Sequence, residues 1–135
     1  MTDRKRAGAR DRAAKPPASA ARRLGRARIL WIASVRTDRR PHLAPVWFAW
    51  VGGSFYVSTA PGSVKARNLE RNRRAVVALE DGVRPLVCEV EASTVARPYP
   101  RPVVEAFLRK YDWRIDREAT YSRLLRLSPR RWQAG

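Results

Sequence analysis

A short basic segment after a turn is the strongest candidate for chemistry in this sequence. Residues 58–69 read Ser-Thr-Ala-Pro-Gly-Ser-Val-Lys-Ala-Arg-Asn-Leu, which predicts the end of a strand, a turn and the start of a helix. The first N–H groups of a helix lie unpaired at the positive end of its dipole, so a phosphate beside Ser63 would meet several donors. Lys65 and Asn68, three residues apart, share one helix face. The segment therefore predicts an anion site, although an ordinary capped helix with a solvated basic face has the same local pattern.

The other reactive side chains point to no catalytic group. Cys88 lies in an apolar stretch with no base close to it in the sequence, which is typical of a structural thiol. His42 could donate a hydrogen bond to a substrate, but a lone histidine beside a proline is more typical of a turn. With one cysteine and one histidine, the chain lacks the ligands of a Cys/His metal cluster and the second thiol of an internal disulfide. We expect no metal, and the sequence assigns no catalytic residue.

The charge of the chain is high and unevenly distributed. Its 135 residues fit one domain, and a net charge of +17 favours an acidic partner. Arginine outnumbers lysine 25 to 4, so coding bias is an alternative source of this charge. Residues 1–25 are basic, interrupted by prolines and poor in apolar periodicity, which predicts a disordered tail. Such a tail could bind nucleic acid or an anionic membrane surface weakly and without sequence preference.

The sequence contains no membrane-spanning or secretory segment that we can identify. No apolar run approaches the roughly 20 residues of a spanning helix, and the N-terminal charges are not followed by an apolar signal core. We therefore expect no membrane insertion and a cytoplasmic location.

From residue 28 onward the pattern predicts short strands and two helices. Residues 28–36 are apolar on both faces, which indicates a strand covered on both sides, for instance by a second subunit. Pro45 lacks an N–H group, so its strand should lie at a sheet edge or carry a bulge there. We expect a mainly β domain over residues 26–135, a six-stranded antiparallel barrel flanked by short helices. The further expected elements are strands 43–50, 55–58, 75–79, 85–95 and 121–127, and helices over 63–72 and from Pro102 onward.

Four short motifs in this order resemble the pyridoxamine 5′-phosphate oxidase-like split-barrel family. They are His-Leu-Ala-Pro-Val-Trp-Phe (42–48), Phe-Tyr-Val-Ser-Thr (55–59), Ser-Val-Lys-Ala-Arg-Asn-Leu (63–69) and Leu-Ser-Pro-Arg-Arg-Trp (127–132). The resemblance covers about residues 26–132 and implies a homodimer that binds a flavin or deazaflavin at the subunit interface. By this resemblance, the phosphate of the cofactor is held by Lys65 and Asn68, with hydroxyl and N–H groups from Ser58, Thr59 and Ser63, and the ring system is lined by Pro45, Val46 and Trp47.

The resemblance implies an oxidoreductase that transfers a hydride to or from a small organic substrate. The cofactor is expected to be the deazaflavin coenzyme F-420 or FMN, and the positive charge of the chain slightly favours the acidic tail of F-420. Two alternatives remain open: a flavin-binding sensor or carrier without turnover, and a basic nucleic-acid-binding domain. An absorption spectrum of the purified protein that shows a bound flavin or deazaflavin would exclude the nucleic-acid-binding domain.

Overall fold

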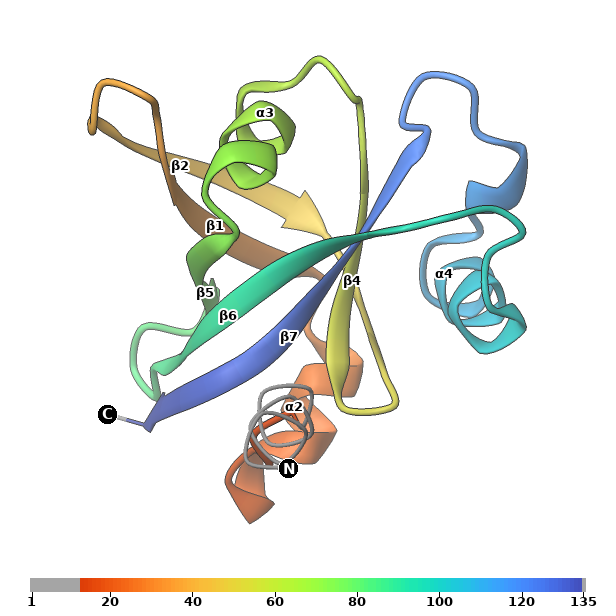
Figure 1. Ribbon diagram of the computed structural model, residues 1–135. Coiled ribbons are helices and arrows are strands. Elements are labelled where there is room, and N and C mark those ends of the chain that lie inside the picture. Colours follow the sequence, from red (N-terminus) through yellow and green to blue (C-terminus); the bar gives the residue numbers. More distant parts are fainter. Residues whose placement is uncertain (1–12, 135) are drawn as a thin grey trace, which may run out of the picture.

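Seven antiparallel strands form one curled sheet, a half-open barrel with the strand order β2-β1-β5-β6-β7-β4-β3 (Figure 1). The computed structural model describes residues 13–134. The strands are β1 (Ile29–Val35), β2 (Pro41–Trp47), β3 (Ala49–Val51), β4 (Ser54–Thr59), β5 (Arg74–Leu79), β6 (Leu86–Val95) and β7 (Arg123–Ala134). The helices are the 3-10 turn η1 (Ala18–Ala20), α2 (Ala21–Arg26), α3 (Val64–Arg71), α4 (Arg101–Tyr111) and the 3-10 turn η2 (Ile115–Arg117).

The mainly β architecture with flanking helices is confirmed, but the described residues form seven strands instead of six. The expected strand 43–50 is interrupted at Phe48, where β2 ends and β3 begins after it. Phe48 and Ala49 are both buried, so the two-residue alternation of a strand is broken there. The backbone of Phe48 is instead satisfied by α4: its N–H donates to Tyr111 Oη at 3.1 Å, and its carbonyl accepts from Lys110 Nζ at 3.1 Å.

The last strand is longer than the sequence pattern predicts. Strand β7 runs through Pro129, which the sequence analysis placed outside the expected strand 121–127. The register of the paired strand β6 shifts between Glu89, which lies opposite Arg131, and Val90, which lies opposite Pro129, so a bulge is present here. Such a bulge accommodates a residue that has no N–H to donate.

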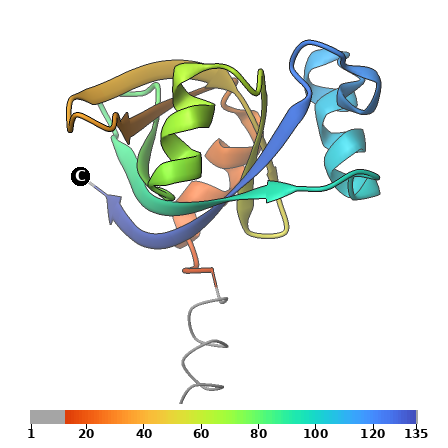
Figure 2. The same cartoon turned by 45° about the horizontal axis from the view of Figure 1, so that its top comes forward.

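Between Ala13 and β1, the chain packs against the barrel. In Figure 1, α2 lies at the lower end of the barrel and α3 toward the upper end, and Figure 2 shows α4 at the side of the sheet, apart from α3. Leu24 is fully buried in the barrel core, so the prediction of a disordered tail through residue 25 is wrong for the helical residues from Ala18. Ala20 is buried in the same core, and the indole N–H of Trp132 donates to the carbonyl of Ala14 at 2.9 Å, so several contacts anchor this polar segment. Residues 1–12 of the expected tail lie outside the described residues.

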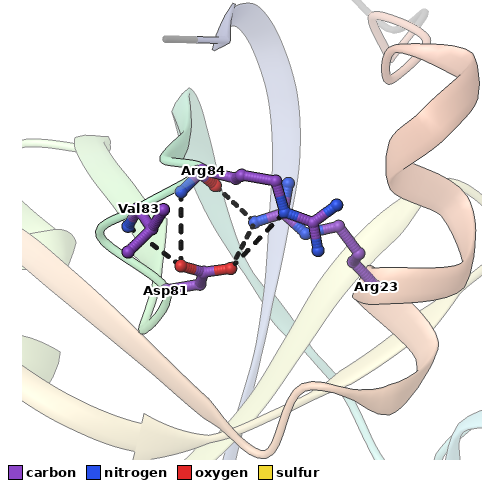
Figure 3. Close-up of polar contacts among 4 residues, drawn as sticks. All are labelled: Arg23, Asp81, Val83 and Arg84. Atoms are coloured by element: carbon purple, nitrogen blue, oxygen red, sulfur yellow. Dashed lines mark hydrogen bonds and ion pairs between the residues drawn. The ribbon is translucent and has the colours of Figure 1, made fainter.

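A polar cluster fixes α2 to the loop between β5 and β6 (Figure 3). Arg23 donates to the carbonyl of Arg84, and its guanidinium lies 3.8 Å from the Asp81 carboxylate. Asp81 accepts the N–H groups of Val83 at 2.9 Å and of Arg84 at 3.2 Å. These hydrogen bonds from Arg84 and Val83 hold the pKa of Asp81 below its usual value.

The outward face of the first strands is apolar. Leu30, Ile32 and Ser34 of β1 point into the core, whereas the alternate residues of β1 point outward. Ala33 pairs with Leu43 on one side and with Val76 on the other, and Leu43 is 63% exposed. In the isolated chain, only the inward face of the expected strand 28–36 is therefore fully covered.

Candidate functional site

A cavity of about 370 Å³ lies where the end of β2, the end of β4, the start of α3 and the loop after α4 meet. Its lining unites six of the eight residues that the sequence analysis assigned to the cofactor. Those six are Pro45, Val46, Trp47, Ser58, Thr59 and Lys65, and the lining also includes Trp113, Glu118 and Tyr121.

Lys65 supplies a cation to this cavity. It lies in the first turn of α3, is half-buried, and forms no hydrogen bond or ion pair with any residue in the range 13–134. Burial lowers the pKa of its ammonium group, because removing water penalises the charged form. A partly desolvated cation without a counter-ion is stabilised by a bound anion, so the site fits a phosphate-bearing ligand.

The hydroxyl groups beside Lys65 are held in a short chain. Thr59 Oγ1 and Ser63 Oγ lie 3.2 Å apart, and Ser63 Oγ accepts the N–H of Ala66 at 3.2 Å as the N-terminal cap of α3. Ser63 therefore orders the helix start but does not line the cavity. Ser58 Oγ donates to the carbonyl of Tyr121 at 2.7 Å and so fixes the far side of the cavity to β4.

Asn68 does not share a cavity with Lys65. Its Nδ2 donates to Ser34 Oγ at 3.1 Å, and only 7% of the residue is exposed. The expected common face of Lys65 and Asn68 is divided, because α3 packs against β1 along the side that carries Asn68. Asn68 instead lines a second cavity and ties α3 to β1. A direct contact of Asn68 with a cofactor phosphate stays a prediction.

This second cavity, of about 210 Å³, lies between α3 and the β1–β2 hairpin. Asp38 is the acidic residue of its lining and binds Arg40, with 2.7 Å between Oδ2 and Nε. Four arginines line the same cavity, so its lining carries a net positive charge. They are Arg36, Arg40, Arg67 and Arg71.

Stacked aromatic rings border the first cavity. The ring of Trp47 lies parallel to that of Tyr111, and the ring of Trp113 meets Trp47 edge-on at 5.8 Å. Trp113 and Tyr121 are also in edge-to-face contact, with centroids 6.2 Å apart. A cavity with flat aromatic walls at one part and an ammonium group at another suits a ligand that joins a planar ring system to an anion.

The loop residues Trp113, Glu118 and Tyr121 were missed in the sequence analysis. They lie between α4 and β7. Trp113 and Glu118 fall where periodicity predicts neither a helix nor a strand, and Tyr121 was expected to begin the last strand, which starts at Arg123. The available signal was local: Glu118 accepts the N–H groups of Thr120 and Tyr121, a pattern that turn-forming acidic residues often adopt. That pattern indicates a turn but says nothing about which cavity the turn borders.

His42 and Cys88 differ in their surroundings. His42 is a residue of β2, paired with Ser34, so the expectation that it is a turn residue is wrong; the turn lies before it, at residues 37–39. Its Nδ1 is buried without a hydrogen-bond partner in the described part of the chain, and burial, Arg36 and Lys65 lower its pKa.

Cys88 is buried in the barrel core, where burial raises its pKa to about 12. The thiol is therefore unreactive, in agreement with a structural role.

Two negative findings apply to residues 13–134. Within them, no three His, Cys, Asp or Glu side chains come together as a metal site would require. Over the same residues, no helix combines the length and the apolar character that crossing a bilayer needs.

Comparisons with known proteins give one family. The sequence profile of the family described as pyridoxamine 5′-phosphate oxidase matches residues 17–134. No curated protein matches the chain significantly in sequence. Among solved structures, the chain is similar to HutZ, the heme storage protein from Vibrio cholerae, with a TM-score of 0.71 and 21% identity over 87% of this chain and 92% of that one. It is also similar to an F420 reductase, with a TM-score of 0.64 and 22% identity over 82% of this chain and 92% of that one. A FAD-binding protein from Mesorhizobium loti has a TM-score of 0.64 and 15% identity over 87% of this chain and 93% of that one. These similarities show a shared split-barrel fold.

Proposed function

Because the chain belongs to the pyridoxamine 5′-phosphate oxidase family, we propose that it is a flavin- or deazaflavin-dependent oxidoreductase acting on a small organic substrate. The cofactor is FMN or coenzyme F-420, held in the cavity that Lys65 and Trp47 line. When bound, it supplies the hydride chemistry, and the protein supplies binding, orientation and electrostatics.

The observation that carries this proposal is the half-buried ammonium group of Lys65, which has no ion pair within residues 13–134, in a cavity with a flat aromatic wall. Lys65 binds the phosphate as a compact charge, assisted by the positive end of α3. The hydroxyl groups of Ser58 and Thr59 border the same cavity and offer further hydrogen bonds. Trp47 and Val46 provide the apolar surface for the ring system.

A homodimer completes the proposed site. Pro45 and Trp47 line the cavity and also belong to the outward side of β2, next to the apolar surface around Ala33 and Leu43. This surface is continuous across β1, β2 and β5, because Ala33 pairs with both Leu43 and Val76. A second copy seated on it would cover the apolar face and add a wall to the cavity.

The choice between the two cofactors rests on charge. Residues of α3 line both the arginine-rich cavity and the Lys65 cavity, and the former carries four arginines against one aspartate. A ligand with several negative charges gains more from such a surface than a ligand with a single phosphate. This favours F-420, with its acidic tail, over FMN.

Titration of the purified protein with FMN and with F-420, followed by fluorescence and absorption, tests the proposal. Saturable binding of either cofactor is expected, followed by a change of its spectrum when a substrate or reductant is added. A protein that binds neither cofactor would contradict the proposal.

A non-catalytic flavin-binding carrier is the second candidate. It is favoured by the similarity in fold to HutZ, a heme storage protein. Tight binding without turnover of any reductant or substrate would support it. Tight, sequence-selective binding of nucleic acid would instead favour a basic nucleic-acid-binding domain, for which the charge of +17 is the argument.

A further inference from the structure

Glu118 is a fixed negative charge in the wall of the Lys65 cavity. Its Oε1 accepts the indole N–H of Trp113 at 2.9 Å. Its Oε2 accepts the backbone N–H groups of Thr120 at 3.1 Å and Tyr121 at 3.2 Å. These donors, the Trp113 indole above all, lower the pKa of Glu118, so the side chain is a carboxylate at neutral pH.

The loop that carries Glu118 is anchored from two sides. Arg97 donates through Nη1 to the carbonyl of Asp116 at 3.1 Å and through Nη2 to the carbonyl of Glu118 at 3.0 Å. Ser58 donates to the carbonyl of Tyr121 from β4. The carboxylate therefore has little freedom to turn away from an unfavourable ligand.

The cavity is consequently bipolar. Lys65 and Glu118 are its two charged lining residues, and Trp113 and Tyr121 are held beside Glu118 by the same hydrogen bonds. An anion is favoured near Lys65 and disfavoured near Glu118, because opposite charges attract and like charges repel, an effect that added salt weakens. The aromatic rings favour flat molecules at the Glu118 end.

We propose that residues 113–121 form the substrate-facing wall of this cavity, and that Glu118 makes it select flat organic molecules without negative charge at that end. The assignment of this wall to a substrate rests on the proposed oxidoreductase function. Glu118 acts by charge and by holding Trp113 and Tyr121 in place.

Three probes with one ring system test the charge selection: naphthalene-2-sulfonamide, which is neutral, naphthalene-2-sulfonate, which is an anion, and 2-naphthylmethylamine, which is a cation at neutral pH. Their binding is measured by equilibrium dialysis on the full chain carrying Lys65→Ala. This background removes the competing cation and needs no bound cofactor, so the result does not depend on the proposed function.

The expected order of affinity is cation, then neutral molecule, then anion, which is opposite to the order that a net charge of +17 would impose. Adding Glu118→Gln should reduce the preference for the neutral molecule over the anion by about threefold to tenfold at low salt, and by less at high salt. Glu105→Gln on the exposed side of α4 changes the net charge equally and should leave the ratio unchanged. Trp113→Phe keeps the carboxylate, so it should preserve the charge order while weakening all three probes.

Preferred binding of the anion before Glu118 is changed, an equal ratio with and without Glu118→Gln, or no binding of the neutral probe would each overturn the proposal. The order of affinity of the three probes is measured with Glu118 unaltered, so it tests the proposal even if Glu118→Gln fails to fold. Failure of the unaltered protein to bind FMN and F-420 would count separately, against the proposed function.

Discussion

The ring of Trp47 lies 4.6 Å from that of Tyr111, centroid to centroid, with an angle of 8° between the ring planes. Tyr111 comes from the last turn of α4, and its Oη lies 2.7 Å from the carbonyl oxygen of Arg28 and 3.0 Å from that of Phe48. It also accepts the N–H of Phe48. One side chain thus fixes both the backbone at the end of β2 and the ring that forms a wall of the cavity.

Replacing this hydroxyl should weaken the fold and the site together. Tyr111→Phe keeps the stacked ring but leaves buried backbone groups of Phe48 with fewer partners, so we expect a loss of about 1 to 3 kcal/mol in the free energy of unfolding. Urea denaturation measures this loss. Tyr121→Phe, at an exposed tyrosine, is the matched control and should have little effect. Equal stability of the two variants would show that the Tyr111 hydroxyl does not hold Phe48.

Lys65→Ala tests the anion site. We expect the free energy of cofactor binding to fall by about 1.5 to 3 kcal/mol, the range of a charge-assisted hydrogen bond. The fold should survive, because Lys65 has no ion pair within residues 13–134 to lose. Fluorescence titration with FMN and F-420 measures the affinity, and Lys15→Ala at an exposed lysine controls for net charge. Unchanged affinity in a folded Lys65→Ala protein would place the phosphate elsewhere.

The strand pattern and the helix start that carries Lys65 could be predicted because they depend on neighbours in the sequence, whereas the other expected cofactor residues came from the family resemblance. Pro45 indicated a sheet edge, and β2 is an edge strand. The position of Lys65 at the start of a helix followed from the turn before it and from Ser63 as its cap. These are local relations, and the sequence contains them.

The remaining features depend on residues far apart in the chain. The break at Phe48 is set by Lys110 and Tyr111, more than 60 positions away. The order of the α2 segment depends on a space in the barrel core that fits Leu24. The role of Glu118 depends on where β4 places Ser58. No periodicity predicts such contacts, because they are decided by packing and not by propensity.

A charge on the outward apolar surface should prevent dimerisation. Leu43→Glu would place a carboxylate where a second copy is proposed to pack, and burying an unpaired charge is costly. We expect a dimer mass for the unaltered protein and a monomer mass for Leu43→Glu by light scattering. Val83→Glu, at a residue that is 91% exposed in the β5–β6 loop, should remain dimeric. A monomeric unaltered protein at micromolar concentration would contradict the proposed dimer.

Because of Lys110, the free energy of unfolding should rise with pH between about pH 8 and 10. Burial, and then the charge of Arg28, lower its pKa in the folded protein to about 8, from 10.5. Between pH 8 and 10 the unfolded chain therefore binds more protons at this position, so stability rises with pH across this window. Lys65 shifts in the same direction, and Tyr111, with a raised pKa, has its effect only above pH 10. Urea denaturation at several pH values should show the rise, and Lys110→Met should reduce it. A fall in stability over this window would contradict the assignment.

Two truncations separate the basic tail from the helix that follows it. Removing residues 1–12 takes away five basic residues, Arg4, Lys5, Arg6, Arg10 and Arg12, and should shorten retention on heparin without changing cofactor affinity. Removing residues 1–24 also removes Leu24 from the barrel core and the Arg23 contact with Asp81. This longer truncation should destabilise the protein by at least the cost of Leu24→Ala, about 2 to 5 kcal/mol. Thermal unfolding of the two truncations and of Leu24→Ala measures the difference. Equal melting temperatures for both truncations would show that α2, although ordered, adds nothing to the stability of the barrel.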